Sequence, residues 1–171
     1  MPMRDCYLDV LTLEDCEQAR LWRNAQLETL RTSYPLTKEQ QAAFYRDVVC
    51  NRQSPHQYYA FLDRELDGEM VAMVGLTNID WVNGHAELSL LVPPTTARVV
   101  WVYDAALDLL LHWAFDQLRL VTVFGECYHC NPQLKWWKLQ GHGSVELPNR
   151  KLSGGKHYSS TLFWFTNRGR P

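Results

Sequence analysis

The chain of 171 residues has little that would place it in a membrane or outside the cell. Its longest apolar run, around residues 105–115, contains Asp108 and His112 and is shorter than the roughly 20 residues of a membrane span. The first ten residues contain no apolar segment like that of a secretion signal. The five cysteines are odd in number and scattered, which gives no disulfide framework. We therefore expect a cytoplasmic protein with no membrane partner.

The chain also has no large excess of positive or negative charge. The 17 basic and 19 acidic residues give a net charge of −2, which argues against a nucleic acid as partner. Hydrophobic residues make up 46% of the chain and charged residues 21%, as in ordinary globular proteins. No linker-like segment divides the sequence, so we expect one domain that spans residues 1–171.

Several motifs of common catalytic and metal sites are absent. The sequence contains no GxSxG elbow, no Walker loop and no dinucleotide-binding fingerprint. Cys127 and Cys130 form one CxxC pair, but a structural zinc site needs four ligands and the chain has no second pair. His142 is the only further ligand nearby, so we expect no metal.

The elements that are present alternate in type along the chain. Thr12 with Asp15, and Thr37 with Gln40, are typical of helix N-termini, and Asn83-Gly84 is typical of a hairpin turn. Hydrophobic periodicity predicts strands near 7–11, 58–63, 70–80, 85–92, 120–126, 144–147 and 158–165, and helices near 13–25, 38–50, 102–118 and 132–139. This order predicts an α+β fold, a mixed α/β protein with helices flanking a largely antiparallel sheet.

Aromatic residues are unusually frequent, with seven Trp and eight Tyr. Most such rings fill cores, while others line ligand pockets or interfaces. This content is compatible with a homodimer.

Four segments together resemble the GCN5-related N-acetyltransferase (GNAT) superfamily, in particular its RimJ/RimL-like branch. They are Leu21-Trp22-Arg23-Asn24 with Pro35-Leu36-Thr37, the strands 74–80 and 85–88, Glu126 to Asn131-Pro132, and Gly154 to Tyr158. The resemblance implies a splayed, mostly antiparallel sheet of about seven strands with about four helices. It also implies an acyl-CoA-dependent N-acyltransferase that uses acetyl-CoA to acylate a primary amine of a small molecule, with amino sugar nucleotides among the candidates.

The loop that holds the CoA pyrophosphate in this superfamily reads R-x-x-G-x-G/A and opens a helix whose N–H groups bind the anion. Arg98 matches the leading basic residue, while Trp101 and Tyr103 replace the two small residues. Two interpretations follow: a loop of altered shape that still binds CoA, or aromatic residues that cover the helix end. By resemblance, the cofactor-binding residues are Leu91, Val92, Arg98, Val99, Val100, Trp101, Val102, Tyr103, Asn131 and Trp137.

The resemblance also suggests residues for the chemistry. Glu87 takes the place of the base that removes a proton from the amine, although an ordinary outward-facing carboxylate would fit the alternating strand equally well. Trp137 replaces the tyrosine that protonates the leaving thiolate in many members, so either Tyr128, water or no residue takes that role. Asn131 either contacts the pantetheine arm or caps the next helix.

On the acceptor side the resemblance places Trp22, Arg23, Asn78 and Asp80. Arg23 either contacts an anionic group of the acceptor or pairs with a nearby glutamate on its own helix.

A second class of function stays open: a GNAT-like fold that no longer uses acetyl-CoA and serves in binding or assembly, or that catalyses another reaction in the same cleft. Arg98 and Glu87 favour the acyltransferase, whereas Trp101, Tyr103 and Trp137, together with the β-branched Val99, favour the alternatives.

Overall fold

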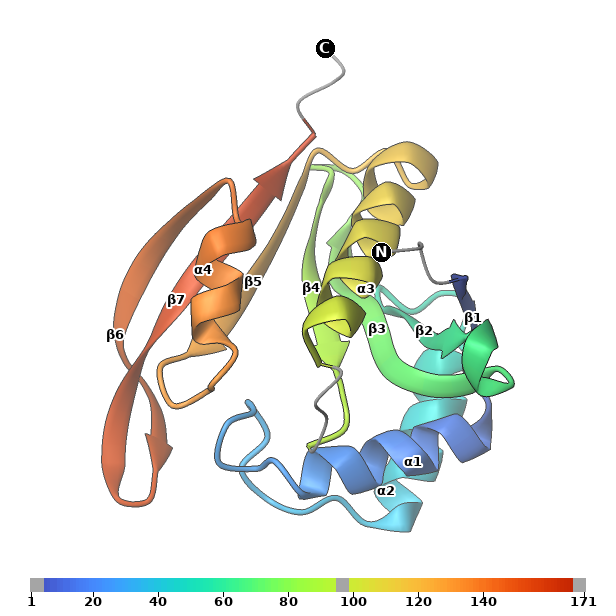
Figure 1. The fold of residues 1–171 in the computed structure, drawn as a ribbon, viewed down its shortest axis with the longest axis horizontal. Coiled ribbons are helices and arrows are strands. Elements are labelled where there is room, and N and C mark those ends of the chain that lie inside the picture. The colour runs from blue at the N-terminus through green and yellow to red at the C-terminus, as the bar shows by residue number, and fades with distance from the viewer. Residues whose placement is uncertain (1–4, 95–98, 168–171) are drawn as a thin grey trace.

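The computed structural model describes residues 5–94 and 99–167 (Figure 1). Its strands are β1 (Cys6–Val10), β2 (Gln57–Asp63), β3 (Glu69–Asp80), β4 (His85–Leu91), β5 (Thr122–Tyr128), β6 (Gly143–Ser153) and β7 (Lys156–Thr166). Its α-helices are α1 (Leu13–Asn24), α2 (Lys38–Phe44), α3 (Val99–His112) and α4 (Leu134–Gln140). The chain continues from α2 into a π-helical turn, Tyr45–Val49, and from α3 into another, Trp113–Gln117, and a 3₁₀ turn spans Arg64–Leu66.

The strands form one sheet in the order β1-β2-β3-β4-β5-β7-β6. All neighbours are antiparallel except β4 and β5, which pair in parallel from His85 opposite Thr122 to Glu87 opposite Phe124. Beyond these residues the two strands diverge, so that β5, β7 and β6 lean away from the other four strands (Figure 1). The predicted fold class, with seven strands and four α-helices among the described residues, is confirmed.

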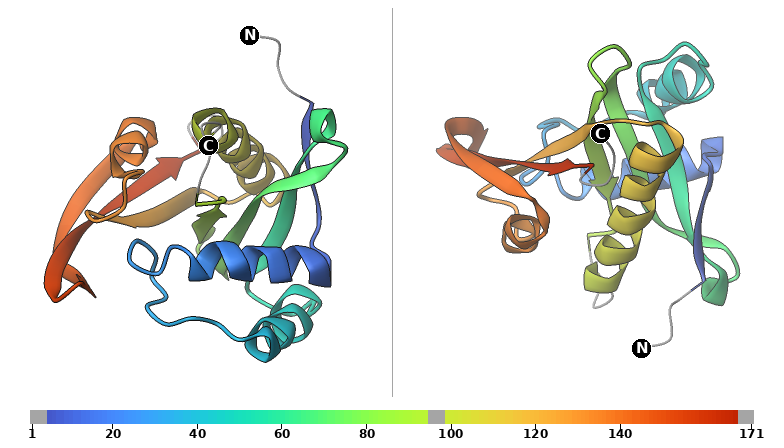
Figure 2. Two further views of the ribbon diagram at one scale, coloured as in Figure 1. Left: turned by 60° about the horizontal axis from the view of Figure 1, so that its bottom comes forward. Right: turned by 90° about the horizontal axis from the view of Figure 1, so that it is seen from above.

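The helices cover both faces of the sheet (Figure 2). Helices α3 and α4 lie on one face, and α1 and α2 lie on the other. The two predicted capping boxes are present: Thr12 Oγ1 accepts from the Asp15 N–H at 3.1 Å, and Thr37 Oγ1 accepts from the Gln40 N–H at 3.2 Å. Each box satisfies backbone donors that the first turn of a helix leaves free.

A hydrophobic core lies on each face. Phe61, Leu76, Leu110 and Phe163 belong to the larger cluster, which fills the space between the sheet, α3 and α4. Trp22 belongs to the smaller cluster beneath α1, together with Leu11, Cys16, Ala19, Ala60, Met70, Met73 and Leu91. None of the described helices is long and apolar enough to cross a bilayer.

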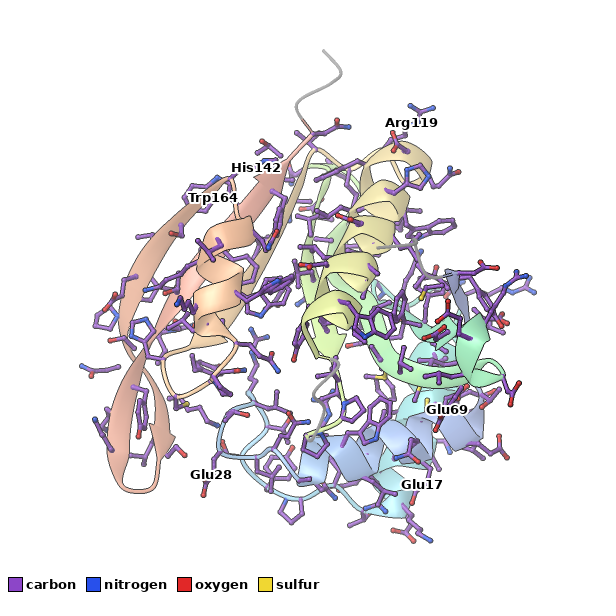
Figure 3. The ribbon with its side chains drawn as sticks, in the orientation of Figure 1. Glu17, Glu28, Glu69, Arg119, His142 and Trp164 are labelled. Carbon is purple, nitrogen blue, oxygen red and sulfur yellow. The ribbon has the colours of Figure 1, made fainter. Side chains whose placement is uncertain are left out.

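Several boundaries differ from the predicted ones, among them the start of α3 and the end of β6. The helix expected from residue 102 begins at Val99, so residues 99–102 form its first turn. The last hairpin is longer than expected, because β6 resumes its pairing with β7 at Lys151 after an irregular segment from Leu147. Figure 3 shows His142 and Trp164 where this hairpin begins. The ring of Trp164 covers Gly143, where an added Cβ would lie 2.3 Å from Cζ2 of that ring.

Candidate active site

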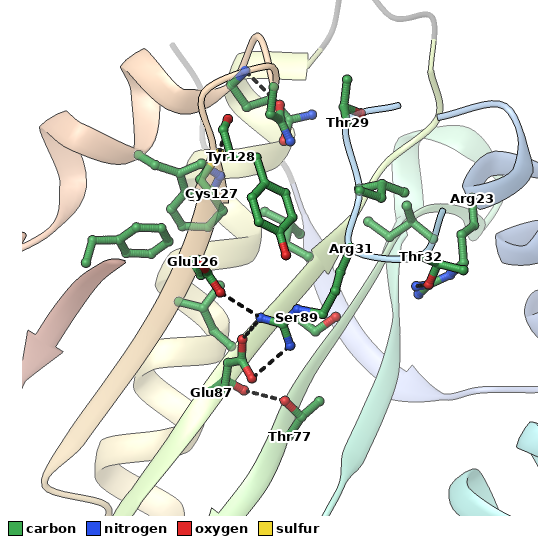
Figure 4. A pocket seen from close by; sticks show the side chains of 18 of the residues that line it. Arg23, Thr29, Arg31, Thr32, Thr77, Glu87, Ser89, Glu126, Cys127 and Tyr128 are labelled. Atoms are coloured by element: carbon green, nitrogen blue, oxygen red, sulfur yellow. Dashed lines mark hydrogen bonds and ion pairs between the residues drawn. The ribbon is translucent and has the colours of Figure 1, made fainter. Parts of the chain in front are cut away.

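A cavity of about 310 Å³ lies where β4 and β5 separate (Figure 4). Strand β4 contributes one wall and β5 another, and the segment 29–32 after α1 closes a third side. Its lining comprises Arg23, Thr29, Leu30, Arg31, Thr32, Tyr58, Thr77, Glu87, Leu88, Ser89, Leu90, Leu91, Glu126, Cys127, Tyr128, Asn131, Gln133, Trp137 and Phe163.

Two carboxylates face each other across the splay, Glu87 on β4 and Glu126 on β5, with side chains only 12% and 7% exposed. The Arg31 guanidinium lies between them (Figure 4). It binds Glu87 through both terminal nitrogens, with Nη1 at 3.3 Å from Oε2, and its Nη2 lies 3.4 Å from Glu126 Oε2. The hydrogen bond with Glu87 is the main reason that the pKa of Arg31 rises above its usual range. The pair therefore forms a site for a cation, which Arg31 supplies.

Glu126 remains ionised despite its burial. Desolvation alone would raise its pKa, but hydrogen bonds from Arg150 and Ser160 outweigh it and lower the pKa. Arg150 Nε donates to Glu126 Oε1 at 3.0 Å, and Ser160 Oγ donates to the same oxygen at 2.6 Å. These contacts connect β5 to both strands of the last hairpin.

The segment that carries Arg31 is held over the cavity from three directions. Lys151 Nζ on β6 donates to the Leu30 carbonyl and, at 3.1 Å, to Ser33 Oγ. Asn24, at the end of α1, holds the backbone of Leu36 through both ends of its amide, at 2.8 and 2.9 Å. The Cys130 thiol donates to the carbonyl of Glu28, the residue labelled beneath α4 in Figure 3, at 3.3 Å. The position of Arg31 therefore depends on contacts far apart in the sequence.

The structure brings six of the predicted site residues to this cavity: Arg23, Glu87, Leu91, Tyr128, Asn131 and Trp137. Asn131 Oδ1 accepts from the Gln133 N–H at 2.9 Å, so it caps the turn before α4. Trp137 is buried and stacks on Phe163, with ring centroids 4.6 Å apart.

Other predicted residues lie elsewhere. Trp22, Val92, Trp101 and Val102 line a second hollow of about 460 Å³ between α1, β3 and α3, and Trp22 is buried in the core. Asp80 is outside the cavity because its carboxylate accepts from the Val82 and Asn83 N–H groups in the turn after β3.

Asn78 and Tyr103 have different surroundings. Asn78 adopts a left-handed φ of 51° at an irregularity of β3, and its Nδ2 lies 3.4 Å from Glu87 Oε2. It therefore borders the carboxylate site. Tyr103 is 2% exposed and packs in the core beside Trp136, with ring centroids 5.2 Å apart.

The remaining predictions concern the start of α3. Val99 and Val100 form its first residues, and Arg98 lies outside the described residues.

Four side chains of the candidate site escaped the sequence analysis: Arg31, Glu126, Arg150 and Lys151. Arg31 lies in an irregular segment without periodicity, and Lys151 follows the predicted end of its strand. Glu126 had a usable signal, since it ends the predicted strand 120–126 and begins one of the segments that resemble the GNAT superfamily.

The cysteine pair shows no sign of a metal site. Burial is the main cause that raises the pKa of the Cys127 thiol to about 12, so this thiol is protonated at neutral pH. In the described ranges, no three His, Cys, Asp or Glu side chains are grouped to hold a metal ion.

The sheet splays between β4 and β5, α3 begins beside the splay, and two carboxylates line the cavity there. The family model described as acetyltransferase (GNAT) domain matches residues 6–135. The chain belongs to this family, which confirms the predicted superfamily and its class of enzyme, the N-acetyltransferases. The RimJ/RimL-like branch stays a prediction.

Solved structures share the fold. The spermidine N-acetyltransferase from Vibrio cholerae in complex with CoA and spermine has a TM-score of 0.79 and 14% identity, covering 94% of this chain and 95% of that one. A probable acetyltransferase has a TM-score of 0.70 and 17% identity, covering 95% of this chain and 93% of that one. No curated protein sequence matches the chain.

Proposed function

We propose that this protein transfers the acetyl group of acetyl-CoA to a primary amine of a small molecule. The observation that carries the proposal is the pair Glu87 and Glu126, which face each other across the splay of β4 and β5 and hold a cation between them.

The carboxylate pair suits an amine acceptor. An alkylamine with a pKa near 10.4 is mostly an ammonium at neutral pH and must lose a proton before it attacks. Arg31, with 60% of its side chain exposed, marks where such a cation binds, and the acceptor ammonium must displace its guanidinium toward solvent. Glu87 Oε2 lies at the cavity wall and takes the proton, while Glu126 stays charged through Arg150 and Ser160.

The residues at the splay fit an acyl-CoA. Beyond Glu87, β4 has a strand neighbour on the β3 side only, so alternate backbone groups up to Leu91 face the splay. Tyr103 packs into the core, so its ring does not cover the start of α3. The backbone of Leu91 and Val92, Asn131 and the first turn of α3 would hold the cofactor, which supplies an activated thioester when bound.

Tyr128 is the proposed proton donor to the leaving sulfur. It lines the cavity on β5, and the Lys151 ammonium lies 5.6 Å from its ring centroid. The Arg31 guanidinium interacts with the Tyr128 hydroxyl. Water remains able to carry this proton if Tyr128 is replaced.

The acceptor could be drawn from two groups of amines. Spermidine N-acetyltransferases share the fold, and the sequence resemblance extends to enzymes of amino sugar nucleotides. Both groups offer the unhindered primary amine that the carboxylate pair requires.

The test begins with acetyl-CoA. Calorimetry should detect binding, and ligand at a hundred times its dissociation constant should stabilise the fold by about 2.7 kcal/mol. In a screen of primary amines, Glu87→Gln should lower kcat by about 100-fold or more and leave the protein folded and able to bind acetyl-CoA. No binding at millimolar acetyl-CoA would refute the proposal, and full activity of Glu87→Gln would remove this residue from the mechanism.

A further inference from the structure

Arg23 is a cation that faces the active-site cavity with most of its donors unused. The adjacent side chains on α1 do not share this environment: Trp22 packs in the core, and Asn24 binds the backbone of Leu36. Within the described ranges its only side-chain hydrogen bond is a long one, 3.5 Å from Nη1 to Thr32 Oγ1, and no carboxylate pairs with its guanidinium. Figure 4 shows Arg23 and Thr32 together, across the cavity from Glu87 and Glu126. A guanidinium carries five N–H donors, so most of them remain for a ligand.

No carboxylate around the cavity is left to neutralise the positive charge of Arg23. Both carboxylates are already engaged, Glu87 by Arg31 and Glu126 by Arg31 and Arg150. Lys151 adds another buried cation, which binds a carbonyl and a hydroxyl. The surroundings of the cavity are therefore positive on balance. Burial is the main reason that the pKa of Arg23 is lowered, and a bound anion would offset this cost of desolvation.

Tyr58 adds a neutral donor next to Arg23. It lines the same cavity from β2 and is half-buried, and its ring packs edge-on against Phe44. Burial, partly opposed by Arg23, raises its pKa, so the hydroxyl keeps its proton at neutral pH. A planar guanidinium beside a hydroxyl donor suits the oxygens of a carboxylate or a phosphate.

We propose that the acceptor is an amine that also carries an anionic group, a carboxylate or a phosphate, and that Arg23 binds this group while Glu87 and Glu126 receive the amine. The inference rests on the proposed acetyl transfer and narrows its substrate class to amino acids, amino sugar phosphates and similar compounds. A polyamine such as spermidine has no anion for Arg23 and would add to the positive charge of the cavity.

Matched acceptor pairs test the proposal on the unmodified protein. Phosphoethanolamine is compared with ethanolamine, glucosamine 6-phosphate with glucosamine, and lysine with cadaverine; spermidine is included as a polyamine. In at least one pair the anionic member should have a kcat/KM about 10- to 100-fold higher than its partner. The phosphate and carboxylate pairs together identify which anion the site prefers.

Arg23→Gln should abolish this preference by lowering kcat/KM for the anionic member, and Arg23→Lys should retain part of it. The matched control is Arg46→Gln, because Arg46 is an exposed arginine paired with Asp47 outside the cavity. Circular dichroism and acetyl-CoA affinity verify that each variant folds.

Calorimetry with the same pairs measures binding directly, so it tests the inference even if no amine is acetylated. Tighter binding of the anionic member, lost in Arg23→Gln, supports the inference. Equal binding and equal turnover of both members, or a preference that survives Arg23→Gln, would overturn it. Failure of acetyl-CoA to bind is a separate result and counts against the proposed acetyl transfer.

Discussion

Glu126 shows how one side chain keeps its charge in a nearly closed site. The Ser160 hydroxyl, fully buried, donates to it at 2.6 Å, and Arg150 donates from the solvent side. Both hydrogen bonds favour the carboxylate over the neutral acid. Because the folded pKa lies below the ordinary value of 4.5, this carboxylate stabilises the fold at pH values above 4.5.

Ser160→Ala should therefore destabilise the protein in a pH-dependent way. We expect a loss of about 1.5–3 kcal/mol at pH 7, the usual contribution of a hydrogen bond to a charged group. The loss should shrink as the pH falls below 4.5 and through the folded pKa, since the acid no longer needs this donor. Urea unfolding at pH 7 and pH 4 measures the difference. An equal loss at both pH values would contradict the role given to Ser160.

At the scale of residues, the resemblance to the GNAT superfamily placed Glu87 on a predicted strand and Arg23 on a predicted helix. Alternation along the strand alone left Glu87 open to the role of an ordinary outward-facing carboxylate. Arg31 could not be placed, because an irregular segment carries no period and its partners lie 56 and 95 positions away.

Among the elements, α4 depends most on its packing. It has seven residues, and no side chain caps its first turn at Gln133. Isolated helices of this length are not stable in water. Trp137 supplies the main contact by stacking on Phe163 of β7, and the neighbouring Trp136 packs on Tyr103.

Trp137→Ala should cost about 3–5 kcal/mol in the free energy of unfolding, as large-to-small changes in a core do. Trp137→Phe should cost less, because it keeps an aromatic ring on Phe163. The matched control on the same helix is Leu139→Ala, whose side chain is exposed and whose loss should stay within about 0.5 kcal/mol. Chemical denaturation monitors all three variants. Equal effects of Trp137→Ala and Leu139→Ala would show that the stack does not hold α4.

Element types were predictable, but some boundaries were not. Capping residues and glycine turns have local causes, so Thr12, Thr37 and Gly154-Gly155 were read correctly. The extent of β6 was underestimated because Pro148 and Asn149 resemble the end of a strand. Pairing with β7 carries the strand past them, a tertiary effect that local propensity does not encode.

For the molecule as a whole, the last hairpin acts as an anchor for the segment after α1. Lys151 reaches from β6 to Leu30 and Ser33 and thereby joins the two sides of the splay. Lys151→Met should keep much of the packing but remove these hydrogen bonds.

We expect amide hydrogen exchange of residues 28–33 to become about tenfold faster or more in Lys151→Met, because this segment then opens without global unfolding. Lys156→Met is the control, since Lys156 is an exposed lysine on the same hairpin that lies over the ring of Tyr158. Unchanged exchange in Lys151→Met would show that Asn24 and Cys130 hold the segment without it.

The contact of Lys151 with the segment after α1 also has a consequence for the order in which parts of the protein fold. The contact between Lys151 and Leu30 closes a loop of 121 residues, and contacts of such separation form late because their closure entropy must be overcome first. On the ribosome, the chain up to β5 already contains Glu87, Glu126 and Arg31 but not Arg150, Lys151 and Ser160, which bind Glu126 and the segment that carries Arg31. The catalytic cleft is therefore among the last parts to become ordered, and a chain stalled before residue 151 would carry its chemical groups without their alignment.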